Sequence, residues 1–250
     1  MHREHPVWDD KAVERYEAWF RTRAGSFALR SELRLIDHMI SSWPRRFNSL
    51  LEIGCGPGFF LDHFYKAGFE TTGIDSSPAM IRAAGCRLDT KVDLHVGQGD
   101  HLPFRDKEFD YAALITVLEF ADNPAPMLAE ARRVARKGLL IAYLNKLSLY
   151  YLMHGLPLGR NSKGVLRSAH WFTPLGMRGL VNRTMAGFPV YHRSVLLGPV
   201  CSWRPRFPWK HLNQLIGLPM FGAFNTIRVD FKGETPLTPL YLESRAGVGG

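Results

Sequence analysis

The stretch that decides the fold is Leu50-Leu51-Glu52-Ile53-Gly54-Cys55-Gly56-Pro57-Gly58. The largely apolar residues 50–53 predict a short buried strand, and glycines at alternate positions follow it directly. Glycine permits a tight turn and lets a ligand lie against bare backbone. We expect this turn at the carboxyl end of the first strand, which is where ligands bind in open α/β sheets.

Strand and helix patterns alternate after this turn. Strands are predicted at 50–53, 71–74, 92–96, 109–115 and 139–144, and helices at 59–67, 78–84 and from the Asn123 cap to Gly138. This alternation predicts an α/β fold with a parallel sheet covered by helices on both faces. Residues 190–197 and 226–231 read as a closing antiparallel pair. Two helices are expected before the sheet, one capped by Asp9 or Asp10 and separated from the next at Gly25-Ser26.

The glycine spacing and one acid favour a cationic ligand over a dinucleotide. A dinucleotide turn places its third glycine or alanine one residue later, where this chain has Phe59. Glu52 stands at the tip of the first strand, where a carboxylate would repel a pyrophosphate. The same carboxylate would stabilise a positively charged group, although pairing with a basic side chain is a simpler role for it.

Two further acids follow the second and third strands. Asp75 ends Thr72-Gly73-Ile74-Asp75, a place from which an acid commonly binds ribose hydroxyls. Asp100 follows the third strand, where its carboxylate can accept a hydrogen bond from an exocyclic amine. The three acids together describe a site for an adenosine that carries a positive charge, which is S-adenosylmethionine (SAM).

Four motifs carry a resemblance to a known family. Glu52–Gly58, Gly73–Asp75, Gly97–Phe104 and Phe109–Phe120 resemble, in order and spacing, the class I SAM-dependent methyltransferases, specifically the type 11 (UbiE/COQ5-like) group. The resemblance covers roughly residues 45–145. It implies a Rossmann-like, seven-stranded, mostly parallel sheet with one antiparallel strand near an edge. It also implies that SAM is the cofactor and S-adenosylhomocysteine (SAH) the product.

The resemblance also implies site residues. The glycine loop would hold the methionine part of SAM, Asp75 the ribose and Asp100 the adenine amine, with His101 lining the ring. The segment Leu114–Glu119 would contact the sulfonium, and Tyr16 and Trp19 would close over the ligand unless they only pack. The predicted cofactor-binding residues are Glu52, Gly54, Cys55, Gly56, Gly58, Asp75, Ser76, Met80, Asp100, His101, Thr116, Tyr16 and Trp19.

The net charge of +9 is distributed unevenly. Residues 1–140 hold 19 Lys+Arg and 20 Asp+Glu, whereas residues 141–250 hold 13 and 3. No acidic residue lies between Glu130 and Asp230, and this stretch is rich in aromatic residues. We expect a positive surface that faces an anionic partner, or a solvated basic face without a partner.

The domain scheme follows from these patterns. We expect a helical cap at 1–44, the SAM-binding core at 45–145, a basic aromatic insertion at 146–225 that forms a lid over the acceptor, and a closing strand and tail at 226–250. Such a lid suits a small or amphipathic acceptor, quinone-like or lipid-like, or contact with an anionic membrane. RNA methylation and non-catalytic SAM binding are the alternatives, and RNA is less favoured because the basic residues are dispersed.

Methyl transfer is an in-line displacement that needs a base only for some acceptors. His170, Glu119 and His154 are the candidates for one. No metal-binding motif is present, so no metal is expected. The cysteines, Cys55, Cys86 and Cys201, fit reduced thiols in a cytoplasm, and neither a signal peptide nor a spanning helix is expected. The sequence leaves the oligomeric state open.

Overall fold

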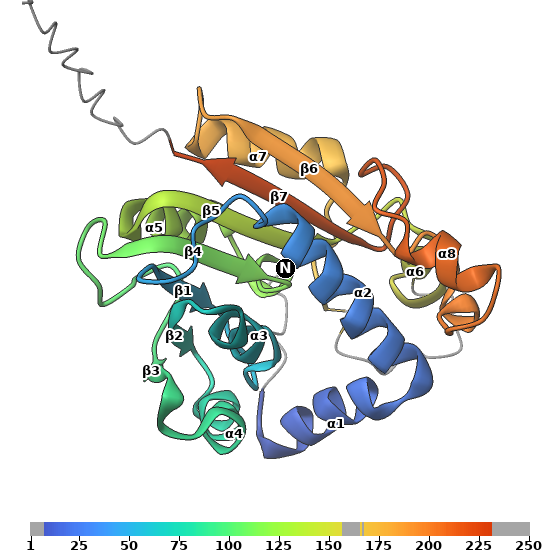
Figure 1. Ribbon diagram of the computed structural model, residues 1–250, viewed down its shortest axis with the longest axis horizontal. Coiled ribbons are helices and arrows are strands. Elements are labelled where there is room, and N and C mark those ends of the chain that lie inside the picture. Colours follow the sequence, from blue (N-terminus) through green and yellow to red (C-terminus); the bar gives the residue numbers. More distant parts are fainter. Residues whose placement is uncertain (1–7, 157–165, 167, 232–250) are drawn as a thin grey trace, which may run out of the picture.

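A seven-stranded sheet forms the centre of the computed structural model, which describes residues 8–156, 166 and 168–231 (Figure 1). The strand order is β3-β2-β1-β4-β5-β7-β6. β7 pairs antiparallel with both β5 and β6, and the remaining pairs are parallel. The strands are β1 Ser49–Ile53, β2 Glu70–Asp75, β3 Asp93–Val96, β4 Phe109–Ile115, β5 Ala135–Leu144, β6 Val190–Val195 and β7 Phe224–Asp230. The predicted sheet, with one antiparallel strand next to an edge, is confirmed.

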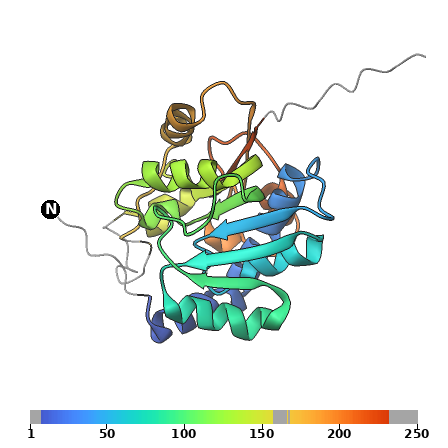
Figure 2. The same cartoon turned by 90° about the vertical axis from the view of Figure 1, so that its left-hand side faces the viewer.

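Helices cover both faces because side chains alternate between the faces of each strand. Leu50 and Tyr111 point to the face covered by α2 Arg23–Met39 and α3 Phe59–Ala67. Leu51 and Ala112 point to the opposite face, covered by α5 Pro124–Val134 and α7 Pro174–Thr184. Figure 2 shows the two helical layers on either side of the sheet. Nearly continuous apolar strands such as β4 therefore belong to a sheet that is buried on both sides.

The predicted N-terminal helices are present, with a different boundary. α1 Asp10–Arg21 is capped by Asp9, whose side chain accepts a hydrogen bond from the Ala12 amide. Thr22, rather than Gly25-Ser26, separates α1 from α2, and its hydroxyl caps α2 by accepting from the Gly25 amide. Gly25 instead allows the two helices to approach, since a Cβ there would lie 2.0 Å from the Trp19 carbonyl oxygen. α1 then packs on both α2 and α4 Pro78–Leu88.

The fifth strand is longer than predicted and the helix before it is shorter. The helix expected to reach Gly138 ends at Val134, and β5 already begins at Ala135. Gly138 lies inside the sheet, where a Cβ would come within 3.0 Å of both Trp43 and the Val229 carbonyl oxygen. Tertiary packing therefore overrides the helical pattern of this segment.

The segment 146–225 contains both core and surface elements, and its role as a lid stays a prediction. α7 and β6 are core elements, because α7 packs on α5 and β6 is the edge strand of the sheet. The rest forms one end of the molecule, at the right of Figure 1, with α6 Leu149–His154, η4 Val200–Ser202 and α8 Trp209–Gln214. Residues 157–165 and 167 of the predicted lid, and the predicted tail after 231, lie outside the described residues. No helix of the described residues has the length and apolar character needed to cross a membrane.

Candidate functional site

Each of the three glycines of the turn has a structural reason to be glycine. All three have positive φ, +71° at Gly54, +52° at Gly56 and +80° at Gly58. A Cβ on Gly54 would lie 2.2 Å from a Val117 methyl, and Gly58 is the N-cap of α3. At Gly56 a Cβ would meet only the Met80 sulfur, at 4.0 Å. Gly56 therefore exposes bare backbone to a ligand, while Gly54 and Gly58 shape the turn.

Asp75, at the end of β2, holds this turn. One carboxylate oxygen accepts a hydrogen bond from the Gly56 amide at 2.9 Å and the other accepts from the Ser77 amide at 2.9 Å. Burial raises the Asp75 pKa, and the two amide hydrogen bonds oppose that shift. Each oxygen can accept a further hydrogen bond, and Asp75 lines the cavity, so its carboxyl group is available to a ribose hydroxyl.

Glu52 is the most buried charged group in the site. Its side chain is about 1% exposed, and its Oε2 atom has no hydrogen-bond partner among the described residues. Burial, with a smaller contribution from the Asp75 charge, raises the Glu52 pKa well above its ordinary value. A buried carboxylate without a partner is costly, so it points to a cationic or hydrogen-bond-donating ligand.

These groups open into one cavity of about 1550 Å³. One end of it, here called the cofactor end, lies along the carboxyl ends of β1, β2 and β3. Its lining includes ten of the predicted residues or their neighbours in these motifs, namely Glu52, Gly54, Cys55, Gly56, Asp75, Ser76, Met80, Gly97, Gly99 and Asp100. Predicted residues from three separate motifs are thus brought together in space.

Gly58 and His101 are predicted residues that do not line this cavity. Gly58 lies at the start of α3, where a Cβ would meet Leu88 and Ala84 instead. His101 is exposed, and its place in the cavity wall is taken by the preceding residues 97–100. Their predicted roles, like those of the other site residues, stay predictions.

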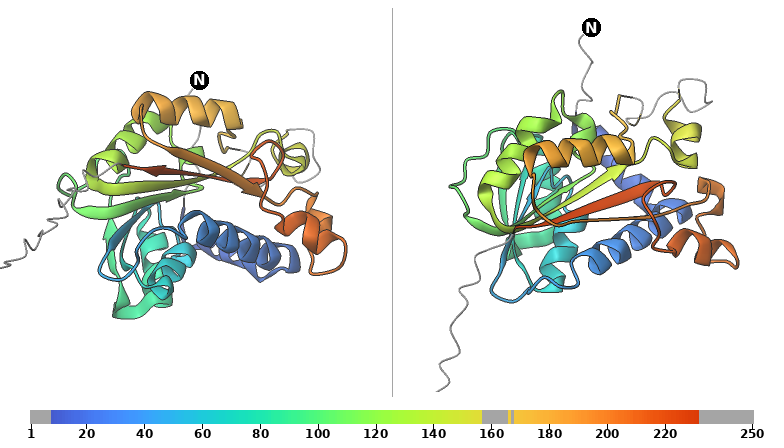
Figure 3. Two further views of the ribbon diagram at one scale, coloured as in Figure 1. Left: turned by 45° about the horizontal axis from the view of Figure 1, so that its top comes forward. Right: turned by 90° about the horizontal axis from the view of Figure 1, so that it is seen from above.

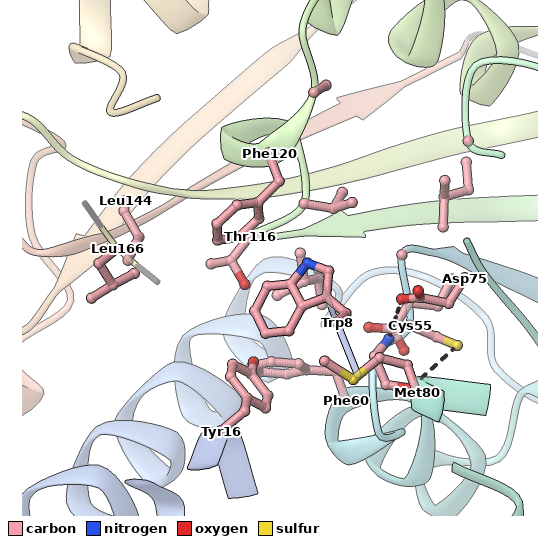
Figure 4. A pocket seen from close by; sticks show the side chains of 18 of the residues that line it. Trp8, Tyr16, Cys55, Phe60, Asp75, Met80, Thr116, Phe120, Leu144 and Leu166 are labelled. Atoms are coloured by element: carbon pink, nitrogen blue, oxygen red, sulfur yellow. Dashed lines mark hydrogen bonds between the residues drawn. The ribbon is translucent and has the colours of Figure 1, made fainter. Parts of the chain in front are cut away.

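Aromatic side chains lie at the middle of the cavity. Tyr16 and Trp19 from α1 line it, as does Thr116 after β4. Tyr16 packs edge-on against Trp8, with ring centroids 5.9 Å apart, and Trp8 packs against Phe120 at 5.4 Å. Figure 4 shows Trp8, Tyr16 and Thr116 between Asp75 on one side and Leu144 and Leu166 on the other.

Beyond these rings the cavity continues into a region here called the acceptor chamber. Its lining is apolar and aromatic and comes from α2, α3, α6 and the turns around β5, β6 and β7. These residues are Ala28, Glu32, Phe60, Leu144, Tyr150, His154, Leu166, Leu196, Trp203, Ala223 and Phe224. The Tyr150 and Trp203 rings, 5.0 Å apart, pack across two of these segments.

Glu32 is the carboxylic acid of the acceptor chamber. It forms no hydrogen bond or ion pair with any described residue, and burial raises its pKa from 4.5 to about 8. Its charge contributes to raised pKa values of both Tyr16 and Tyr150, so it lies near both phenols. An unpartnered carboxyl among aromatic rings is suited to bind a hydroxyl or amine of a ligand.

The three candidate bases have different positions. His154 lines the acceptor chamber, its buried Nε2 atom has no partner within the described chain, and burial lowers its pKa. Glu119 does not line the cavity, and its Oε1 accepts from the Leu144 amide at 2.6 Å; burial raises its pKa to about 8. His170 is exposed and also lies outside the lining, with its amide donating to the Glu119 carbonyl oxygen.

The sequence reasoning missed Trp8 and Glu32. Trp8 precedes α1 in a segment that shows no helical or strand periodicity. Its ring packs against Tyr16, and its carbonyl oxygen accepts a hydrogen bond from the Ser77 hydroxyl. Only these contacts place Trp8 at the site. Glu32 lies in a helix whose apolar positions dominate the pattern. The helix holds two acids, Glu32 and Asp37, and the sequence gives no signal that Glu32 is the one that faces a cavity.

The groups that line the cofactor end fit SAM. The unpartnered Glu52 oxygen suits a cationic group, bare backbone at Gly56 permits close approach, and Asp75 can accept from ribose hydroxyls. Within the part of the chain that the structure describes, no group of three or more His, Cys, Asp or Glu side chains is arranged to hold a metal ion.

The chain is similar to known methyltransferases in sequence and in fold. Residues 51–142 match the methyltransferase-domain family. An uncharacterised protein of Methanocaldococcus jannaschii is 35% identical over 129 residues, which is 52% of this chain and 56% of that protein. A ubiquinone biosynthesis O-methyltransferase of Hydrogenovibrio crunogenus is 28% identical over 42% of this chain and 46% of its own. A mouse 18S rRNA (guanine-N(7))-methyltransferase is 43% identical over 30% of this chain and 26% of its own.

The chain thus spans about half the length, or less, of the curated relatives that it matches. Among solved structures, a SAM-dependent methyltransferase of Thermotoga maritima, described as a possible histamine N-methyltransferase, has a TM-score of 0.68 at 24% identity. That likeness covers 89% of this chain and 98% of the other, and it shows the fold. Residues 51–142 therefore match the methyltransferase-domain family, and the chain has the fold of the SAM-dependent methyltransferases.

Proposed function

We propose that this chain is a SAM-dependent methyltransferase that methylates a small or amphipathic, largely apolar acceptor. The observation that carries this proposal is the single cavity of about 1550 Å³ that joins the cofactor end to the acceptor chamber. A site for one small ligand usually measures roughly 300–1,000 Å³. The larger volume supports a site for two ligands that meet inside the protein.

The residues at the two ends would act by orientation. SAM supplies an electrophilic methyl group when it is bound. The glycine turn, Glu52 and Asp75 would fix the ligand at the cofactor end, and the rings of Trp8 and Tyr16 would exclude water from the junction. The acceptor chamber would then hold the nucleophile in line with the methyl group, and such positioning lowers the barrier of a transfer between two bound molecules.

The lining of the acceptor chamber supports an apolar acceptor with at least one hydrogen-bond donor. Its walls are mostly aromatic and aliphatic, and Glu32 offers an acceptor for a hydroxyl or amine proton. The whole cavity is lined by five acids, Glu32, Glu52, Asp75, Asp100 and Asp122, and by one arginine, Arg15. An interior with one arginine among five acids offers little to bind phosphate, so it gives no support to a nucleic-acid acceptor even though one curated relative is named as an rRNA methyltransferase.

A transfer assay with methyl-labelled SAM tests this function. The purified protein is incubated with an extract of the cells that make it, and the products are split into organic, aqueous and macromolecular fractions. We expect label in the organic fraction, and less of it with Trp203→Glu, which places a charge in the acceptor chamber, than with the exposed control Leu175→Glu.

Each outcome separates the alternatives. Label in RNA or protein would overturn the apolar acceptor but keep the methyltransferase. No transfer, with SAH binding intact, would favour a non-catalytic SAM-binding protein.

A cytoplasmic location stays a prediction, which the free thiols of Cys55, Cys86 and Cys201 support.

A further inference from the structure

The outer side of α6 is apolar where a surface helix normally carries polar residues. Tyr150 and His154 face inward, toward the acceptor chamber. Leu149, Leu152 and Met153 are exposed, and their i, i+3, i+4 spacing puts them on one outer face. A short helix with aromatic residues inside and aliphatic residues outside lacks the polar face that water would select.

A second exposed apolar segment lies at the same end of the molecule. It runs through α8 and the turn before β7, and its exposed members are Phe207, Leu212, Leu215, Leu218, Met220 and Phe221. Asn145, just before α6, donates from its side-chain amide to the carbonyl oxygens of Met220 and Gly222, so the two segments are in contact. Figures 1 and 3 place α6 and α8 at one end of the molecule in each view.

Basic side chains accompany this apolar surface. Lys146, Arg204, Arg206 and Lys210 are exposed in the same two segments, and none of them forms an ion pair with a described residue. No acidic residue occurs in the sequence from 131 to 229 to neutralise them. Apolar side chains flanked by unpaired cations match the chemistry of a membrane surface with anionic headgroups.

We propose that the α6–α8 end, residues 146–153 and 204–221, docks on an anionic lipid membrane. The apolar side chains would enter the boundary between headgroups and acyl chains, and the basic side chains would contact the headgroups. The exposed cations favour this occupant over a second copy of the chain, because identical basic surfaces repel one another.

This surface has a direct relation to the acceptor chamber, and this part of the inference rests on the proposed function. Tyr150 and His154 line the acceptor chamber from the inner side of α6, and Trp203 lines it from the segment that leads into α8. The docked face and the acceptor chamber are therefore two sides of the same segments. An amphipathic acceptor could pass from the membrane into the acceptor chamber without crossing water.

Co-sedimentation with lipid vesicles tests the docking surface without using activity. The full chain is mixed with vesicles of phosphatidylcholine alone or with about a third phosphatidylglycerol, at low and high salt. We expect the protein to sediment with the anionic vesicles only, and less of it at high salt.

Two double variants with matched controls locate the contact. The first double variant, Leu218→Asp with Phe221→Asp, removes apolar side chains that are 74% and 64% exposed. Its control, Phe47→Asp with Leu175→Asp, removes apolar side chains elsewhere that are 85% and 77% exposed. The second double variant, Arg206→Glu with Lys210→Glu, changes exposed basic residues of this surface. Its control, Lys91→Glu with Arg105→Glu, changes exposed basic residues elsewhere. We expect each α6–α8 variant to bind anionic vesicles roughly tenfold more weakly or worse, and each control to bind as the wild type does.

Three results would overturn the proposal. One is no vesicle binding by the wild type. The second is equal loss in the variants and their controls. The third is a wild-type dimer that Leu218→Asp with Phe221→Asp converts to a monomer without any vesicle binding, which would assign the surface to self-association. Any of these leaves the methyltransferase proposal intact, whereas vesicle binding without methyl transfer would overturn only that proposal.

Discussion

The cofactor end and the acceptor chamber belong to one cavity, but they are built in different ways. The cofactor end comes from short motifs at the carboxyl ends of three neighbouring strands, Glu52–Gly56, Asp75–Met80 and Gly97–Asp100. The acceptor chamber collects single residues from distant segments, such as Glu32, Tyr150 and Trp203. Backbone geometry defines the first region and side-chain packing defines the second.

The difference predicts how each region responds to substitution. Changes at the cofactor end should disturb backbone that several motifs share, so they should weaken ligand binding. Changes in the acceptor chamber should alter acceptor use while SAH binding persists. The experiments below test this division, beginning with the largest expected effect.

Gly54→Ala should have the largest effect. The new methyl group would lie 2.2 Å from a Val117 methyl at a residue with φ of +71°, so the turn and the segment after β4 must both move. Overpacking and backbone strain together cost about 2–5 kcal/mol. We expect SAH affinity, measured by calorimetry, to fall roughly hundredfold or more.

Gly187→Ala is the control for that change. Its φ of +86° is similarly strained, but a Cβ there meets nothing within 4 Å. We expect it to keep its SAH affinity. If Gly54→Ala also keeps its affinity, the turn does not shape the cofactor end.

Glu32→Gln should separate the two ends of the cavity. Because Glu32 lies in the acceptor chamber and not at the glycine turn, we expect SAH affinity to stay within about twofold of the wild type, as for a change outside the cofactor end. Methyl transfer should fall about tenfold, because the amide changes the hydrogen bond that the carboxyl group would make to the acceptor. Glu14→Gln, at an exposed position of α1, is the control. Equal loss of SAH binding and transfer would contradict the division.

The raised pKa of Glu32 predicts that the free energy of unfolding depends on pH. Burial raises the Glu32 pKa to about 8, so between the ordinary value of 4.5 and about 8 the folded chain holds a proton that the unfolded chain has released. The Glu32 contribution to stability therefore falls as pH rises through that window. We expect Glu32→Gln to exceed the wild type by about 1–3 kcal/mol in free energy of unfolding near pH 8.

Urea unfolding at two pH values measures this difference. The advantage of Glu32→Gln should shrink as the pH falls to about 4, below the ordinary pKa of 4.5, where both states of the wild type are largely protonated. A constant or reversed difference would mean that Glu32 is not desolvated in the folded chain.

His170→Ala should have the smallest effect. His170 was a candidate base, but it is exposed and outside the cavity lining. We expect the rate of methyl transfer to remain within about twofold of the wild type, as for most surface changes. A large loss of kcat at unchanged SAH affinity would return His170 to the candidate bases.

The sequence predicted the sheet and the cofactor end because their determinants are local. Gly54, Gly56 and Asp75 lie at strand ends, and strand ends of a parallel sheet meet at one edge. It misplaced the helix break at Gly25 and the end of α5, because contacts with Trp19 and Trp43 decide those positions. It could not predict the acceptor chamber, where Glu32 and Trp203 come together only through tertiary packing.

The central claim is that the cofactor end binds the adenosyl ligand through Asp75, and titration of SAH into the wild type and into Asp75→Ala tests it most directly. We predict saturable binding to the wild type and a loss of about tenfold or more in the variant, since a hydrogen bond to a charged group contributes roughly 1.5–3 kcal/mol. Asp93→Ala, exposed on β3, is the control and should bind normally. Equal affinity of the wild type and Asp75→Ala, or no SAH binding at all, would contradict the account.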